Sequence, residues 1–461
     1  MTPVEAKAPP WERDPFLYIH RLPNGEYSIA GKYNPASIKD QMVRAVALID
    51  RAIFHKVLDN PRKLLVVGAG AAGASAAFRG CEHKINTTLV ERNTSPFERQ
   101  RNSSRVVDPT EFDWPAPHWR DAGMPGLPLL FERGPASAIA ARWQEVYDQR
   151  ERDDIYLTVR TRTLFVRSMQ LPDGRHVALF QDVDSKDNHW EEFDFVLNCA
   201  GPGEEQVSLG DSKYASYLFW ADDKLEADNF GLPSPLPQPR ILISGGGDGA
   251  LQDFLRIAFP GKTARDVYEH LLPEASMSLL RAEIERKIFA AEDAFRRAWV
   301  WSEDERLDCQ VLRLLHQVHR EVAKDAAKQI QAAKTVPRPF ADRLANVRVM
   351  HSCDHFSICY AFNRFLALLV NELAGAKHFV PNRRLRQVYS AAPAAHQCDL
   401  RPAYCWEHPH EVHFSESTCA EQRDVGKPAV HDIVVLRHGP KAGTPKLARQ
   451  ILPYGSPWSK P

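Results

Sequence analysis

One short segment limits what this chain can fold into more than any other. In LLVVGAGAAGASAAFRG an apolar run leads through a glycine-rich turn into a helix of small residues, and NTTLVER follows as a second apolar run. In such a unit Gly68 permits the tight turn, Gly70 lets a pyrophosphate approach the backbone, and Gly73 lets helix and strand pack closely. The helix start offers N–H groups and the positive end of its dipole. With Glu91 ending the second strand as a ribose acceptor, the segment predicts a dinucleotide site.

The same residues restrict which dinucleotide binds. A carboxylate at Glu91 repels a 2′-phosphate, which favours FAD or NAD over NADP. VVGAGAAGASAA…TTLVER, within residues 63–92, resembles the N-terminal FAD-binding segment of the two-dinucleotide-binding flavoproteins. These include the pyridine nucleotide-dependent oxidoreductases and the flavin monooxygenases, so the resemblance implies FAD. It places the cofactor at Gly68, Gly70, Ala71, Ala72, Gly73, Glu91 and Arg92. A glycine-rich turn of another kind of α/β protein is the alternative.

A later strand is similar to the segment through which that family returns to its FAD domain. FVLNCAGPGEE carries Cys199, Ala200 and Gly201 where the family has a motif like Ala-Thr-Gly. The resemblance therefore adds Ala200 and Gly201 to the cofactor-binding residues. A buried strand that ends in a Gly-Pro turn is the alternative interpretation.

A second glycine-rich turn follows the strand-like RILIS and resembles the phosphate loop of the family's nicotinamide-dinucleotide domain. Its residues are Gly245, Gly246, Gly247, Asp248 and Gly249. No strand with a ribose-selecting residue follows at a distance of about 20 residues, where the fingerprint has one. The ligand of this turn is therefore NAD(P)H or, if the turn has been remodelled, another molecule.

A helical block interrupts this second unit. Residues 263–335 show Leu, Ile, Ala and Val in stripes typical of helices. We interpret them as an insertion, which predicts that VRVMH pairs with RILIS in one parallel sheet. Asp354 or His355 would then lie at the carboxyl edge of that sheet, near the ligand crevice.

These segments predict an α/β protein with doubly wound, Rossmann-like parallel sheets, an FAD lobe and an NAD(P) lobe, and a helical insertion. The short pieces FLYIH and EYSIAG near the start predict strands. The predicted segments are an arm and helix at 1–60, an FAD lobe at 61–235 with a lid-like loop at 94–134, a second lobe at 236–380, and a strand-rich segment at 381–461.

Composition excludes several classes of partner. Lys+Arg and Asp+Glu both total 59 in 461 residues, so no overall field attracts nucleic acid or an anionic membrane. No apolar run approaches the length of about 18 residues that spans a bilayer. The eight cysteines form no CxxC pair, which is typical of a reducing compartment. We expect a cytoplasmic protein with a small-molecule substrate, no nucleic acid and no membrane partner; the oligomeric state is unknown.

Two residues are candidates for catalysis. His118 lies in the long loop with Asp113, Trp114 and Trp119. Together these residues combine aromatic surface with groups able to move protons. An unperturbed histidine titrates near neutrality, which suits acid–base chemistry. The alternative is a structural loop whose rings pack on the sheet. Asp248 stands at a helix start, where the dipole favours the ionised form, so we expect it to position a ligand and to donate protons poorly.

Two further motifs carry less weight. Arg437-His438-Gly439 resembles the Arg-His-Gly of histidine phosphatases, but that motif opens a domain and here it stands near the end. Cysteine and histidine residues also cluster near the C-terminus, at Cys398, Cys405, His408, His410 and His413. Their spacing matches no paired-ligand pattern, so we predict no metal.

The leading interpretation is an FAD-dependent oxidoreductase that NAD(P)H reduces and that acts on an unknown small molecule, with a monooxygenase as one form. The alternative is a sensor or scaffold that binds FAD or NAD without turnover. The irregular second turn and the lack of a clear catalytic pair keep this alternative open.

Overall fold

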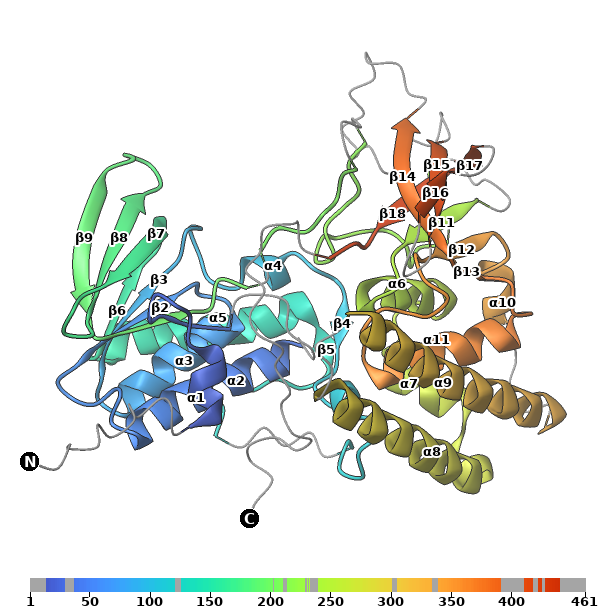
Figure 1. Ribbon diagram of the computed structural model, residues 1–461, viewed down its shortest axis with the longest axis horizontal. Helices are drawn as coiled ribbons and strands as arrows, with labels where there is room; N and C mark the ends of the chain where they lie inside the picture. Colours follow the sequence, from blue (N-terminus) through green and yellow to red (C-terminus); the bar gives the residue numbers. More distant parts are fainter. Residues whose placement is uncertain are drawn as a thin grey trace, which may run out of the picture. The chain divides into compact units, whose positions relative to one another are not determined.

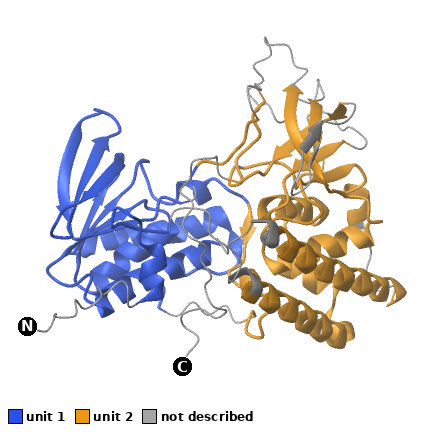
Figure 2. Cartoon of the chain, viewed as in Figure 1, with its two compact units in different colours: residues 1–104, 123–203, 442–461 blue, residues 105–122, 204–441 orange. Residues whose placement is uncertain are grey.

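The chain forms two compact units, which Figure 2 colours separately. Unit 1 contains Met1–Ser104, Gly123–Gly203 and Ala442–Pro461, and unit 2 contains Arg105–Ala122 and Glu204–Lys441. The computed structural model describes residues 14–29, 37–120, 126–201, 203–209, 214–228, 230, 232, 239–300, 305–333, 339–390, 410–417, 422–424 and 428–439. The predicted division into four segments stays a prediction.

Unit 1 is built on a five-stranded parallel sheet in the order β1-β10-β2-β3-β6 (Figure 1). Its strands are β1 (Tyr27–Ser28), β2 (Lys63–Val67), β3 (Asn86–Val90), β6 (Leu157–Arg160) and β10 (Phe195–Asn198). Val67 at the end of β2 pairs with Val90 on one side and with Asn198 on the other. Three strands thus end together at one edge, where open α/β sheets bind ligands.

Unit 1 contains five helices among the described residues. They are α1 (Pro15–His20), α2 (Ile38–Phe54), α3 (Ala71–Glu82), α4 (Glu98–Arg101) and α5 (Ala136–Asp153). A reciprocal capping box starts α2, because the Ser37 hydroxyl accepts from the Asp40 N–H at 3.0 Å and the Asp40 carboxylate accepts from the Ser37 N–H at 3.3 Å. The small residues of α3 are buried, and α3 packs against α2, β2 and β3.

Three further strands of unit 1 form an antiparallel sheet in the order β7-β8-β9. They are β7 (Thr163–Gln170), β8 (His176–Asp182) and β9 (Asn188–Phe193). The turn between the first two contains Gly174, whose φ of +90° suits glycine.

The segment FLYIH is a helix, so its prediction as a strand is wrong. The Asp14 carboxylate accepts hydrogen bonds from the N–H groups of Phe16 (2.8 Å) and Leu17 (3.1 Å). Pro15 occupies the first helical position, where its missing N–H costs nothing. This local cap outweighs the strand preference of the aromatic and branched residues. The neighbouring EYSIAG does contain a strand, β1.

Unit 2 is built on a four-stranded parallel sheet in the order β13-β12-β11-β18. The strands are β11 (Ile241–Ser244), β12 (Val347–Met350), β13 (Phe379–Val380) and β18 (Ile433–Leu436). β11 pairs with β12 in parallel from Ile241↔Val347 to Ser244↔Met350. The predicted pairing of VRVMH with RILIS across the insertion is therefore confirmed, and so is the predicted α/β class with parallel sheets.

The helices of unit 2 include the predicted insertion. They are α6 (Asp248–Ala258), α7 (Ala264–Leu271), α8 (Glu274–Val300), α9 (Glu305–Ala333), α10 (Pro339–Arg343) and α11 (Ala361–Leu373). α8 and α9 pack against each other, and α11 packs against α9, α6 and α7 (Figure 1). An antiparallel sheet completes the unit, with β14 (Arg383–Ser390), β15 (His410–Ser417), β16 (Gln422–Asp424) and β17 (Ala429–His431).

Part of the loop at 94–134 belongs to the core of unit 2. This loop contains β4 (Val106–Val107), a 3₁₀ turn (Glu111–Asp113) and β5 (Gly134–Pro135). Trp114 and Trp119 are each 1% exposed. The ring of Trp114 stacks on Phe362 at 4.8 Å between centroids, and the ring of Trp119 meets Phe362 edge-on at 5.5 Å. These two rings are therefore core side chains that pack on α11, whereas the alternative interpretation places them on the sheet.

Candidate functional site

The first glycine-rich turn joins β2 to α3 at the carboxyl edge of the parallel sheet in unit 1. Gly68 has a φ of +95°, a conformation that L side chains rarely adopt. A Cβ at Gly68 would lie 3.0 Å from the Ala200 Cα, and a Cβ at Gly73 would overlap the carbonyl oxygen of Gly68. The sequence therefore needs glycine at both positions for this turn to fold beside the next strand.

Gly70 differs from these two glycines because no atom of the described residues lies within 4 Å of the Cβ that it lacks. It stands at the N-cap of α3, and no side chain caps this helix. The first N–H groups of α3 therefore point from an uncapped helix start into the space beside Gly70. This geometry fits a phosphate, since a helix start supplies N–H donors and a positive dipole end.

Glu91 lies beside the turn, as the sequence predicts. One carboxylate oxygen accepts from the Ala69 N–H at 2.8 Å and the other accepts from the Asn93 N–H at 2.9 Å. Glu91 is 9% exposed. A carboxylate has about four acceptor sites, so two remain for ribose hydroxyls. Arg92, the next predicted residue, is exposed.

The return segment after β10 also reaches this turn. Ala200 is exposed, and its N–H donates to the Asn198 side-chain oxygen at 3.0 Å. Gly201 has a φ of +83°. Close to it lies Arg99, which the sequence reasoning missed: its Nη2 donates to the Gly203 carbonyl at 2.9 Å, and Nη1 lies 3.7 Å from the position of a Cβ at Gly201. Arg99 is an exposed cation beside the predicted pyrophosphate position.

The second turn, between β11 and α6, repeats the backbone frame of the first. The Gly245 N–H donates to the Met350 carbonyl at 2.9 Å. The Gly68 N–H donates in the same way to Val90 at 2.7 Å. A Cβ at Gly245 would overlap the carbonyl oxygen of Arg437 in the neighbouring strand. Each turn is thus closed by the last residue of the next parallel strand.

The loop after β3 and the loop after β12 also form the same hydrogen bond with their turns. The Phe97 N–H donates to the Ala69 carbonyl at 3.2 Å, and the Ser357 N–H donates to the Gly246 carbonyl at 2.8 Å. Gly247 corresponds to Gly70. Among the described residues, the one atom within 4 Å of a Cβ added at Gly247 is the Ile358 carbonyl oxygen, at 3.9 Å. α6, like α3, begins without a side-chain cap. The two units therefore contain two versions of one turn.

His351 occupies in unit 2 the position that Glu91 occupies in unit 1. It directly follows β12, and its N–H donates to Val380 at 3.1 Å, as the Glu91 N–H donates to Arg160 at 2.9 Å. Burial lowers the pKa of His351 to about 4, so the ring is neutral near pH 7.

The two residues that the sequence favoured for this position lie further along the loop. The Asp354 carboxylate forms an ion pair with Arg313 at 2.6 Å. His355 is buried, and its Nδ1 lies 2.8 Å from the Phe356 carbonyl oxygen. The end of the strand itself belongs to His351, so the expectation for Asp354 and His355 is corrected.

Asp248 differs from its prediction. Its Oδ1 accepts from the Tyr360 N–H at 2.9 Å and from the Asn363 side chain at 2.7 Å. Burial raises the pKa of Asp248 to about 6, and the two hydrogen bonds oppose that rise. The expectation of a poor proton donor is therefore wrong, because desolvation outweighs the dipole of α6. Gly249 is the last residue of the second turn. A Cβ added there would lie 3.2 Å from the Cδ atom of Arg437.

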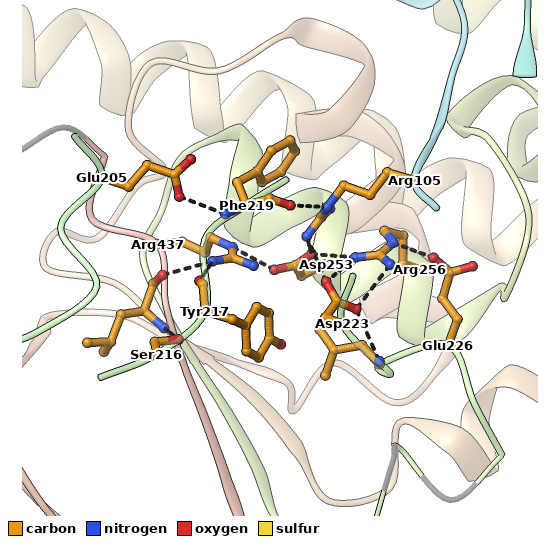
Figure 3. A network of polar contacts seen from close by, with 12 residues as sticks. Arg105, Glu205, Ser216, Tyr217, Phe219, Asp223, Glu226, Asp253, Arg256 and Arg437 are labelled. Atoms are coloured by element: carbon orange, nitrogen blue, oxygen red, sulfur yellow. Dashed lines mark hydrogen bonds and ion pairs between the residues drawn. The ribbon is translucent and has the colours of Figure 1, made fainter. Parts of the chain in front are cut away.

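A buried ionic network holds α6 in place behind the second turn (Figure 3). Asp253 is fully buried and forms ion pairs with Arg105 (2.6 Å), Arg437 (2.8 Å) and Arg256 (3.1 Å). Asp223 accepts two hydrogen bonds from Arg256, at 3.0 and 3.1 Å. Burial favours the protonated Asp253, but the three guanidinium groups outweigh it and lower the pKa of Asp253.

The other predicted candidates lie apart from these turns or have structural partners. His118 is exposed. Arg437 is buried in the network, and His438 Nε2 lies 2.8 Å from the Ser244 hydroxyl, so both support the turn. Cys398, Cys405 and His408 lie outside the described residues, whereas His410 and His413 lie on β15. Within the described ranges no group of three or more His, Cys, Asp and Glu could hold a metal, and no helix could cross a membrane.

No family model and no curated protein sequence match the chain. Among solved structures it is similar to bacillithiol disulfide reductase from Bacillus cereus, at 9% identity and a TM-score of 0.41, covering 82% of this chain and 78% of that one. Thioredoxin reductase from T. acidophilum has 11% identity and a TM-score of 0.37, over 82% and 77%. L-Lysine 6-monooxygenase from Pseudomonas syringae has 17% identity and a TM-score of 0.23, over 37% and 41%.

These structures belong to the FAD/NAD(P) oxidoreductase superfamily, which is the one that the sequence of the first turn resembles. With TM-scores below 0.5, they carry no argument about function. What the chain binds is therefore inferred from its own residues.

Proposed function

We propose that the chain is an FAD-dependent oxidoreductase that binds FAD at the first turn and NAD(P)H at the second. One observation carries the proposal: Gly70 stands at an uncapped helix start with open space where a side chain would be. The backbone there can reach a pyrophosphate without a steric barrier. Every other glycine of this turn is needed by the protein itself, whereas Gly70 is needed only by a ligand.

The residues around Gly70 fit the parts of a dinucleotide. The N–H groups at the start of α3 would hold the pyrophosphate, with Arg99 as a nearby cation. The two free acceptor sites of Glu91 would hold the ribose hydroxyls. Ala200 and Gly201 place backbone rather than side chains beside the turn. A bound FAD supplies two-electron redox chemistry, and the protein orients it.

The second turn supports a second nucleotide. Its backbone frame matches the first turn, its helix start is uncapped, and the space at Gly247 is almost open. At the strand end a neutral His351 replaces the carboxylate, so this side chain does not repel a 2′-phosphate. This arrangement supports NAD(P)H as the reductant without selecting NADH or NADPH.

Gly70→Ala tests the assignment of FAD. The alanine side chain has room in the protein and a φ of −71° suits it, so we expect the free energy of unfolding to change by only about 0.5 kcal/mol. FAD affinity should fall by roughly ten-fold or more, or about 1.4 kcal/mol, because the methyl group occupies the phosphate position. Flavin absorbance of purified, FAD-titrated protein measures this.

Gly134→Ala is the matched control, since Gly134 also has open space around its missing Cβ and belongs to β5, not to the turn. It should bind FAD like the unmodified chain. A purified chain that takes up no FAD, or a Gly70→Ala variant that binds FAD normally, would contradict the proposal.

A sensor or scaffold without turnover is the second candidate, and the second turn favours it in one respect. The Oδ1 of Asp248, beside that turn, accepts hydrogen bonds from Tyr360 and Asn363, which gives this carboxylate a structural role. Anaerobic addition of NADH or NADPH separates the two functions. Bleaching of the yellow flavin supports the enzyme, whereas bound FAD that neither nucleotide reduces supports the sensor.

A further inference from the structure

Arg364 is a buried cation with unmet hydrogen-bond donors. It lies on α11, is 1% exposed, and donates from Nη2 to the Ser357 carbonyl at 3.1 Å. Its Nε and Nη1 have no hydrogen-bond partner among the described residues. Nor does any carboxylate in that part of the chain lie within ion-pairing distance of it. A buried guanidinium in this state is costly unless something else satisfies it.

The inserted helices supply the polar groups around Arg364. On α9, the fully buried His319 has its Nε2 2.9 Å from the Glu292 carboxylate of α8. Burial lowers the pKa of His319. Burial alone would raise the pKa of Glu292, but the His319 hydrogen bond and nearby charges lower it. The pair is therefore a neutral imidazole that donates to an ionised carboxylate.

This protonation state leaves one acceptor unmet. Because His319 donates through Nε2, its Nδ1 carries a lone pair, and no donor reaches it from the described residues. The charge of Arg364 acts on the pKa of both His319 and His316, so these side chains are neighbours. His316 is 9% exposed, and its Nδ1 also has no partner there. Unmet donors on α11 and unmet imidazole nitrogens on α9 thus lie on helices that pack against each other.

We propose that Arg364 binds the carboxylate of a small ligand in a site formed by α11 and the inserted helices α8 and α9. One guanidinium can donate two parallel N–H bonds to a planar carboxylate. Since Arg364 supplies one positive charge and Glu292 is ionised nearby, a monoanion suits the site better than a dianion such as phosphate. Nδ1 of His319 adds an acceptor for a hydroxyl on the same molecule.

Calorimetric titration of the full chain with acetate, glycolate and inorganic phosphate tests this site. We expect acetate and glycolate to bind, glycolate more tightly, and phosphate to bind more weakly than either. Arg364→Gln should weaken the binding of acetate and of glycolate by about ten-fold or more, because a charge-assisted bidentate contact is lost. Arg364→Lys keeps the positive charge but lacks the planar guanidinium. Its affinity for the carboxylates should lie between that of the unmodified chain and that of Arg364→Gln.

Arg320→Gln is the matched control, since Arg320 is exposed on the same helix as His319. It should bind acetate like the unmodified chain. If Arg364→Gln fails to fold, Arg364→Lys and the acetate-dependent rise in melting temperature of the unmodified chain give the result. Absence of binding to the unmodified chain would overturn the proposal, since water alone then satisfies Arg364.

Two other outcomes would also overturn it: acetate affinity unchanged in Arg364→Lys and Arg364→Gln, or phosphate binding more tightly than acetate. The site belongs to unit 2 and the FAD turn to unit 1. The flavin content of the same samples is measured separately, so failure of FAD binding and failure of the carboxylate site are distinguishable.

Discussion

The two glycine-rich turns have the same backbone frame but are supported in different ways. In α3 the buried residue Ala76 lets the helix pack through small side chains. At the equivalent position of α6 stands Asp253, fully buried among three arginines. The first turn thus depends on close packing and the second on charge pairing. The comparison teaches that a dinucleotide-type turn requires its backbone geometry, whereas the surrounding side chains can be replaced as a set.

The charge pairing should matter most for stability. Asp253→Asn removes the carboxylate that pairs with the buried Arg437 and leaves the buried Arg105 with Asp223 alone, so we expect a loss of roughly 3–5 kcal/mol in the free energy of unfolding. Urea denaturation followed by circular dichroism measures it. Asp325→Asn is the control, because Asp325 forms an exposed ion pair with Lys328 at 3.4 Å. A loss below about 1 kcal/mol would mean that α6 does not depend on the network.

The packing of the first turn gives the next largest effect. Gly73→Ala forces a methyl group into the Gly68 carbonyl, so we expect a loss of about 1–3 kcal/mol in stability and loss of FAD uptake. The second turn already has Ala250 at the equivalent position. Ala250→Gly should therefore cost only about 1 kcal/mol and leave FAD uptake unchanged. Normal flavin binding by Gly73→Ala would break the distinction between the two turns.

Titration of Asp248 gives an effect of about 2 kcal/mol. Its pKa is raised from 3.8 to about 6 in the fold, so the folded chain takes up a proton first as the pH falls. Asp248 therefore adds stability as the pH falls from 7 towards 4 and loses that contribution as the pH rises through about 6. Asp248→Asn keeps the hydrogen-bond acceptor and should remove this pH dependence. Chemical denaturation at several pH values compares it with the unmodified chain, and parallel curves would contradict the prediction.

The strand-end residues give the smallest effect. Glu91→Gln keeps an acceptor but removes the charge, so we expect FAD affinity to fall by about 1 kcal/mol. His351→Gln, at the equivalent place in unit 2, should leave FAD affinity unchanged. Titration with FAD, followed by flavin fluorescence, compares the two variants. Equal effects of both substitutions on FAD would place FAD at the wrong turn.

Local patterns made most of the first site predictable. The strand, the spaced glycines and Glu91 lie within thirty residues, so residue type and spacing alone indicate their arrangement. The second site was harder because the inserted helices separate β11 from β12. The counterpart of Glu91 is set by the register of that distant pairing, and spacing favoured Asp354 and His355 where the structure has His351.

Effects of tertiary burial were beyond the sequence altogether. The raised pKa of Asp248 comes from its burial, which outweighs the opposing hydrogen bonds from Tyr360 and Asn363. The unmet donors of Arg364 depend on how α8, α9 and α11 pack. No periodic pattern reports which polar group in a buried helix lacks a partner, because that depends on atoms from three elements.

The placement of β11 has a consequence for synthesis of the chain. Ile241 pairs with Val347 on one side and with Ile433 on the other, so both neighbours of this central strand are made after it. At roughly 5–20 residues per second, the ribosome delivers β12 about 5–20 s after β11 and β18 later still. During that interval an apolar strand has two unpaired edges, and α6, which directly follows β11 and packs against it, is the first helix available to shield it.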